Sequence, residues 1–230
     1  MQDRGLAAYI AELIGTFFLV LIVGTVVSLF VSTGTAAQTG SDFAVIGLVH
    51  ALALFVLIIV FGQVSGGHFN PAVTMGVLAG RRISFGGAIT YWVAQLLGAV
   101  LAAFVLRAAY GGPTEANLGA PAVAAGVSPM TALLLEALMA FILVIVVFGS
   151  AVHTKAPIGF AGLAIGLTLT GNILAGGALT GAAFNPARAF GPALAAGFWQ
   201  DQWIYWVGPM LGGTIGGLLY TQIFLDRDRA

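Results

Sequence analysis

Cysteine is absent from this 230-residue chain. The protein therefore forms no disulfide, and it offers neither a thiolate nucleophile nor a zinc–thiolate site. Charge is also scarce: Asp, Glu, Lys and Arg together make up 7% of the residues, against about a quarter in a soluble domain. So few charges cannot cover a water-facing surface, and we expect most of the surface to face lipid.

An excess of one charge is also missing, because eight basic residues balance eight acidic ones. This balance excludes the broad positive footprint of a nucleic-acid-binding protein. The sequence shows neither a nucleophile–base pair nor a cluster of metal ligands. We therefore expect a protein that is not an enzyme and that has no cofactor, no metal site and no nucleic-acid partner.

Apolar residues make up 60% of the chain, and 33 glycines suit close contacts between membrane helices. A membrane helix needs about 20 predominantly apolar residues. Six stretches qualify, at residues 6–31, 43–62, 85–106, 130–150, 158–174 and 203–225. The first is too long for the apolar region of a signal peptide, so it is interpreted as the first span. Two further apolar segments, 71–80 and 186–196, are too short to cross.

The basic residues of the loops predict the orientation of the spans. If six spans alternate, most basic residues fall on one side: Arg4, Arg81, Arg82, Lys155, Arg227 and Arg229. The loops 32–42 and 108–129 on the other side contain no Lys or Arg. Both termini are therefore expected in the cytoplasm.

The two halves of the chain resemble each other. Residues 11–20 (AELIGTFFLV) match 135–144 (LEALMAFILV), and residues 65–72 (SGGHFNPA) match 180–187 (TGAAFNPA). Each half contains three spans, so the second half must be inserted upside down. We expect a single domain over residues 1–230, made of inverted repeats at about 1–108 and 130–230, with binding elements on short helices at the midplane.

Asn-Pro-Ala begins both short segments, as Asn70, Pro71 and Ala72 and again as Asn185, Pro186 and Ala187. Pro suits the first turn of a helix, and Asn can cap its free backbone donors. The inverted repeat would bring both helix N-termini together at the midplane, each with about half a positive charge. One copy alone could be an ordinary helix cap, whereas two matched copies favour a pore.

These motifs, together with Glu12 and Glu136, resemble the aquaporin (major intrinsic protein) family over nearly the whole chain. The resemblance implies an all-α membrane fold with six transmembrane helices and two re-entrant half-helices. It also implies a pore in each subunit and a homotetramer.

Two polar residues are expected at one level, about 5 Å outside the midplane, from the helical rise of 1.5 Å per residue. These are His50 in the second span and Arg188, one turn after Asn185. By the resemblance, His50, Ile173, Ala182 and Arg188 match the four-residue outer filter of aquaporins. This set is similar to the tonoplast-intrinsic branch. The chain departs from glycerol facilitators, which carry Asp where this chain has Ala189.

Glu12 and Glu136 are carboxylates inside spans, and such residues are functional hypotheses by default. We interpret them as acceptors for the loop backbone before each short segment; a proton relay is the alternative. His153 is interpreted as a solvated loop residue, with a sensor of cytoplasmic pH as the alternative.

The expected function is a passive channel for water, with ammonia, urea and other small neutral solutes as further candidates and with protons and ions excluded. A glycerol or small-solute facilitator is the first alternative. A proton-coupled transporter using Glu12 and Glu136 is an alternative of another class. The expected location is the plasma membrane, crossed several times.

Overall fold

The computed structural model describes residues 5–31, 41–157 and 159–225, and all regular structure in these ranges is helical. The helices are α1 (Gly5–Val31), α2 (Ser41–Ser65), α3 (Pro71–Ala79), α4 (Phe85–Ala109), η1 (Asn117–Gly119), α5 (Pro129–Val147), η2 (Phe148–Val152), α6 (Ala161–Thr180), α7 (Pro186–Ala196), α8 (Ile204–Tyr220) and η3 (Thr221–Leu225). Arg4, Arg227 and Arg229, which contribute to the orientation prediction, lie outside the described residues, as do residues 32–40 and Ile158.

Five helices of the described chain are long and apolar enough to cross a membrane on their own. The sixth crossing is α8, whose α-helical part has 17 residues and continues directly into the π-helical turn η3. The fifth span runs to Thr180, farther than the predicted end at residue 174. The prediction of six spans and two short helices in an all-α fold is confirmed.

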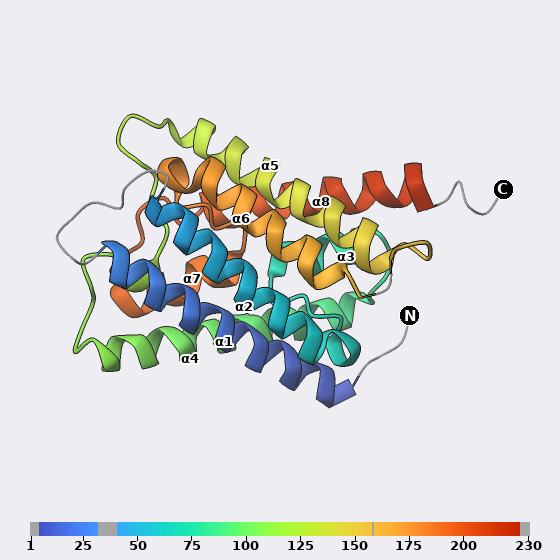
Figure 1. Cartoon of the computed structure of the whole chain (residues 1–230), viewed down its shortest axis with the longest axis horizontal. Helices are drawn as coiled ribbons and strands as arrows, with labels where there is room; N and C mark the ends of the chain where they lie inside the picture. Colours follow the sequence, from blue (N-terminus) through green and yellow to red (C-terminus); the bar gives the residue numbers. More distant parts are fainter. Residues whose placement is uncertain (1–4, 32–40, 158, 226–230) are drawn as a thin grey trace.

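The same order of elements occurs twice, in opposite directions (Figure 1). In each half two long helices are followed by a short one and then by a third long helix: α1, α2, α3, α4 and then α5, α6, α7, α8. In Figure 1, α1 and α5 run in opposite directions, and so do α2 and α6. The start of α1 and the end of the last helix consequently lie at the same end of the bundle (Figure 1).

Glycines allow the long helices to approach closely. Gly98 of α4 leaves no room for a Cβ, because that atom would overlap the carbonyl oxygen of Leu13 in α1. In the other half, Gly212 of α8 approaches the carbonyl of Ala137 in α5 in the same way. Small residues at such crossings are typical of helix packing in lipid, where no hydrophobic force drives the helices together.

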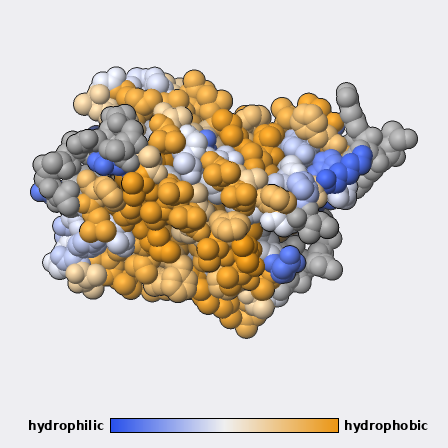
Figure 2. Space-filling model, in the orientation of Figure 1, coloured by the Kyte–Doolittle hydropathy of each residue, from blue (hydrophilic) through white to orange (hydrophobic). Residues whose placement is uncertain are grey.

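The outer surface of the bundle is apolar along its middle. Figure 2 shows hydrophobic residues over the visible faces of the long helices, with hydrophilic residues gathered at both ends. Large apolar side chains such as Leu52, Ile59 and Leu101 are more than half exposed. A water-soluble protein does not display apolar surface on this scale, whereas a bilayer-spanning protein requires it.

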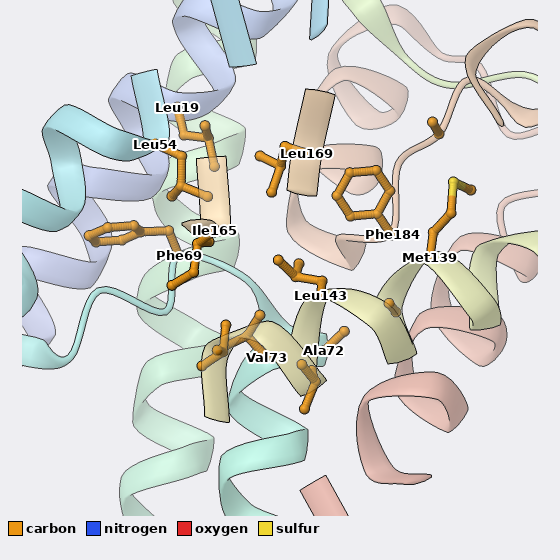
Figure 3. Close-up of a cluster of buried hydrophobic side chains, with 14 of the residues drawn as sticks. Leu19, Leu54, Phe69, Ala72, Val73, Met139, Leu143, Ile165, Leu169 and Phe184 are labelled. Atoms are coloured by element: carbon orange, nitrogen blue, oxygen red, sulfur yellow. The ribbon is translucent and has the colours of Figure 1, made fainter. Parts of the chain in front are cut away.

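The core joins both halves in one apolar cluster. Phe69 and Phe184, which precede the two short helices, enter this cluster from opposite sides, with Leu143, Ile165 and Leu169 between them (Figure 3). Side chains of the two halves are therefore packed together around the place where α3 and α7 begin.

Candidate functional site

Each short helix begins at an Asn cap followed by Pro. The Asn70 Oδ1 atom accepts a hydrogen bond from Ala72 N at 2.8 Å. The Asn185 Oδ1 atom accepts from Ala187 N at 3.1 Å and from Arg188 N at 3.2 Å. These bonds satisfy donors that a helix N-terminus otherwise leaves open. The caps form as the sequence pattern predicts.

The same two amides also cross-link the halves of the chain. Asn70 Nδ2 donates to the carbonyl oxygen of Phe184 at 3.0 Å, and Asn185 Nδ2 donates to that of Phe69 at 2.9 Å. Each bond uses one N–H of an NH₂ group that has two. Because the two bonds are reciprocal, the N-termini of α3 and α7 are held side by side.

The residue before each Asn has an unusual backbone. Phe69 has φ = 46° and Phe184 has φ = 32°, in the left-handed region that side chains other than glycine rarely adopt. Such strain persists only where surrounding contacts over-determine the conformation, and it gathers at functional sites. The contacts in this case come from two buried carboxylates.

Glu12, which is fully buried in α1, accepts four hydrogen bonds. Its Oε1 accepts from Ser65 Oγ at 2.7 Å and from His68 N at 2.9 Å. Its Oε2 accepts from Phe69 N and from Gln95 Nε2, both at 2.7 Å. Two of the four donors belong to the loop before α3 and a third, Ser65, ends α2, so α1 holds this loop in its strained form.

Glu136 of α5 holds the second loop in the same way. Its Oε1 accepts from Thr180 Oγ1 at 2.6 Å and from Ala183 N at 3.0 Å, and its Oε2 accepts from Phe184 N at 2.6 Å. It too is fully buried. This arrangement agrees with the interpretation of both carboxylates as acceptors for loop backbone.

Three cavities follow one another through the protein and share walls. The central cavity, of about 50 Å³, is lined by both Asn70 and Asn185. An outer cavity of about 220 Å³ shares His50 and Arg188 with it. An inner cavity of about 270 Å³, at the end of the bundle where α4 begins, shares His68 with it. Asn70 and Asn185 thus both line the smallest of the three cavities.

His50 and Arg188 meet at the boundary between the outer and central cavities, and both are about 95% buried. His50 Nδ1 lies 2.7 Å from the carbonyl oxygen of Ile46. A carbonyl can only accept, so this nitrogen carries a proton, and in the neutral ring Nε2 is an acceptor. Arg188 Nη1 donates to Gly119 O at 2.7 Å, while Arg188 Nε has no partner among the described residues.

The other two predicted filter residues differ in position. Ile173 lines the outer cavity. Ala182 is buried but is not among the residues that line either the outer or the central cavity, although its neighbours Gly181 and Ala183 are. The structure therefore brings His50, Arg188 and Ile173 to one cavity wall and leaves Ala182 just behind it.

Three contributors to the site were not predicted from the sequence. Gly119, whose carbonyl accepts from Arg188, ends the short helix η1, which has no recognisable sequence motif. Tyr91 of α4 and Tyr205 of α8 donate to the carbonyls of Ser65 and Thr180 at 2.6 and 2.8 Å. The internal repeat of the sequence could have identified these two tyrosines, because Tyr91 and Tyr205 occupy matching places in the two halves.

His153 lies just after η2, outside the three cavities. Its Nδ1 accepts a hydrogen bond from Lys155 N at 3.0 Å, and its ring meets that of Tyr220 edge-on at 6.1 Å. The half-buried ring thus belongs to a local contact between a turn and the end of α8.

Comparison with known proteins agrees with this geometry. The family model described as "Major intrinsic protein" matches residues 2–220. The chain is 46% identical to "Aquaporin TIP1-2" of Zea mays over 96% of this chain and 87% of that protein. It is 41% identical to "Aquaporin TIP2-1" of Arabidopsis thaliana over 96% of this chain and 88% of that protein.

Among solved structures, the aquaglyceroporin from Plasmodium falciparum superposes with a TM-score of 0.84 at 25% identity, over 98% of this chain and 99% of that one. This likeness shows that the two chains share the same architecture. The family match over most of the chain, the two aquaporin relatives and the paired Asn-Pro-Ala helices lead to one conclusion. The chain belongs to the major intrinsic protein family, as a multi-pass membrane protein of the tonoplast-intrinsic-like aquaporin type.

Proposed function

We propose that the protein is a passive water channel that excludes protons and other ions. The observation that carries the proposal is the meeting of Asn70 and Asn185 in the central cavity. Within the described residues, one N–H of each amide donates a hydrogen bond to a carbonyl of the opposite loop. The second N–H of each is available to a water oxygen in a cavity that both side chains line.

The size and polarity of the cavities support water as the solute. A buried water needs at least about 10–15 Å³ of space, so the central cavity of about 50 Å³ has room for a short row of water molecules. Its walls combine a few polar groups with apolar residues such as Leu54 and Leu169. A water passing through therefore exchanges a few hydrogen bonds and is not held at any one point.

Exclusion of cations and protons would come from positive electrostatic potential along the row of water molecules in the pore. The N-termini of α3 and α7 point their dipoles to the centre, and the guanidinium of Arg188 adds a full charge at the outer boundary. Helix dipoles and an Arg are barriers of the kind that exclude protons and cations from such pores. We assign His50, Ile173 and Arg188 to the wall of the outer selectivity filter, with Ala182 packed behind it.

The apolar Ile173 in the outer wall supports ammonia and urea as further solutes, because an aliphatic side chain supplies no hydrogen-bond donor. A broader small-solute facilitator is the second candidate, and the aquaglyceroporin-like architecture favours it. A proton-coupled transporter is less well supported. The oxygens of Glu12 and Glu136 are already bonded to the two loops, which suits a scaffold role.

The assembly and orientation complete the proposal. Four such subunits would form a homotetramer with a pore in each. The end of the bundle that carries Arg81, Arg82 and Lys155 would face the cytoplasm by the positive-inside rule. Arg81 and Arg82 line a cavity with Thr221 and Gln222 of η3, and α1 begins at the same end of the bundle (Figure 1). The relatives are of the tonoplast type, so they give no support to the expected plasma-membrane location.

Stopped-flow light scattering on liposomes with the purified protein tests this function. We expect faster osmotic shrinkage than in empty liposomes, a low activation energy and no need for an ion gradient. Parallel gradients of urea, glycerol and ammonia separate the water channel from the broader facilitator. A requirement for a proton or sodium gradient would contradict a passive channel.

A further inference from the structure

The row of cavities has a second boundary, at its inner end. The central and inner cavities share four residues: Gly66, His68, Val147 and Ala151. A solute that leaves the central cavity of about 50 Å³ for the inner cavity of about 270 Å³ must pass these groups. One wall comes from the loop before α3, and the other comes from the end of α5. We call these residues the inner ring.

The α5 wall lies where the helix changes its geometry. From Phe148 to Val152 the chain forms a π-helical turn, closed by a hydrogen bond of 2.8 Å from His153 N to Phe148 O. Such single π-turns are frequent at functional sites. Phe148 is fully buried against Gly80, whereas Ala151 is exposed on the cavity wall.

The loop wall is held by side-chain and backbone contacts. His68 Nδ1 lies 3.0 Å from Thr74 Oγ1, and its ring meets that of Tyr91 edge-on at 5.1 Å. Its backbone N donates to Glu12. The His68 imidazole is thus positioned by α3 and α4, while α1 holds its backbone.

The internal repeat gives the depth of the ring. The match of residues 11–20 to 135–144 pairs Val23 and Val27 of α1 with Val147 and Ala151 of α5. Val23 lines the central cavity and Val27 the outer one, so this pair lies beside the outer boundary. Their counterparts lie as deep on the inner side. The counterpart of His68 is the small Ala183, so the imidazole is a feature of the inner ring alone.

We propose that His68, Val147 and Ala151 form a second selectivity constriction, which limits the size of neutral solutes in series with the outer filter. This proposal rests on the channel function proposed above. When two constrictions lie in series, the narrower one limits the flux of a solute through the whole pore. A solute accepted by His50 and Arg188 must therefore also pass the inner ring.

Enlarging Ala151 is the direct test, because its side chain lies on a cavity wall and not in the packed core. We expect Ala151→Leu to lower water permeability and Ala151→Phe to reduce it to the level of empty liposomes. Ala108→Phe is the matched control, since Ala108 is exposed on α4 and lines none of the three cavities. Elution volume and thermal unfolding of each variant report its folding.

A folded Ala151→Phe protein that conducts water like the wild type would overturn the inner constriction, while the channel function stands. Absence of any flux in the wild type would instead overturn the channel function. A second measurement decides the matter if Ala151→Phe does not fold. In a His50→Ala background, adding His68→Ala should raise urea and glycerol flux severalfold further. Equal flux in the single and double variants would show that the inner ring does not limit solutes.

Discussion

Glu12 accepts one more hydrogen bond than Glu136, and the additional donor is the side-chain amide of Gln95. Gln95 lies four residues after Tyr91 in α4, and the residue four after Tyr205 in α8 is Pro209. Proline has no side-chain donor to offer. The two halves, which otherwise hold their loops in the same way, are therefore unequal at this point, because only the first carboxylate is also bound by the third long helix of its half.

Replacing each carboxylate by leucine should expose this inequality. Glu136→Leu would leave three donors without an acceptor, and Glu12→Leu would affect four. Each buried donor left unpaired costs about 1–3 kcal/mol. We expect both variants to be destabilised, Glu12→Leu the more strongly, in thermal unfolding of the detergent-solubilised protein. Equal melting temperatures for Glu136→Leu and the wild type would contradict the scaffold role.

The glutamine variants should separate a scaffold from a proton relay. Glu12→Gln and Glu136→Gln each keep one oxygen that can accept from the loop, and neither can carry a proton in a relay. We therefore expect both to fold and to conduct water close to the wild-type rate in liposomes. Folded Gln variants that conduct no water would instead favour the relay.

Opening the outer boundary should change which solutes pass. Arg188→Val removes the guanidinium that Gly119 O holds, and His50→Ala removes the ring next to it. Both changes enlarge the boundary between the outer and central cavities. We expect increased urea and glycerol flux in light-scattering assays, with water flux retained. If solute flux is unchanged in both folded variants, the filter lies elsewhere.

Exclusion of protons should depend on the paired Asn groups and the half-helix dipoles. Asn70→Asp with Asn185→Asp places negative charge where the wild type presents two amides and two helix N-termini. We expect the wild type to show no proton flux above that of empty liposomes under an imposed potential. The double variant should leak. Clear proton conductance of the wild type would refute the barrier, whereas a tight double variant would assign it to the dipoles and Arg188.

Close packing of α8 on the short helix α3 should not tolerate a methyl group. A Cβ at Gly213 would overlap the carbonyl oxygen of Ala72 in the first turn of α3. We expect Gly213→Ala to lower the melting temperature and the water permeability together, because α3 must move. Gly171→Ala is the matched control, since nothing lies within 4 Å of a Cβ there. Alanine is favoured over glycine in a helix by up to about 1 kcal/mol, so this control should melt no lower than the wild type.

The sequence by itself determined the solvent, the number of spans and the place of the two short helices. Apolar stretches long enough to cross a bilayer are local in the chain, and so is the Asn-Pro-Ala cap at Asn70 and at Asn185. Matched segments in the two halves showed that the second half is inverted. These features need no knowledge of distant contacts, because the bilayer sets the length of a span and the cap forms within one helical turn.

Only the tertiary structure decided which distant groups meet. The bond from Arg188 to Gly119 O joins residues 69 positions apart, and those between the Asn amides and the opposite Phe carbonyls join residues 114 and 116 positions apart. The wall that His68, Val147 and Ala151 form between the central and inner cavities likewise depends on how a loop and a π-turn pack against each other. Such contacts arise from packing between helices, because a residue's neighbours in the chain fix its local conformation but not the partner across the cavity.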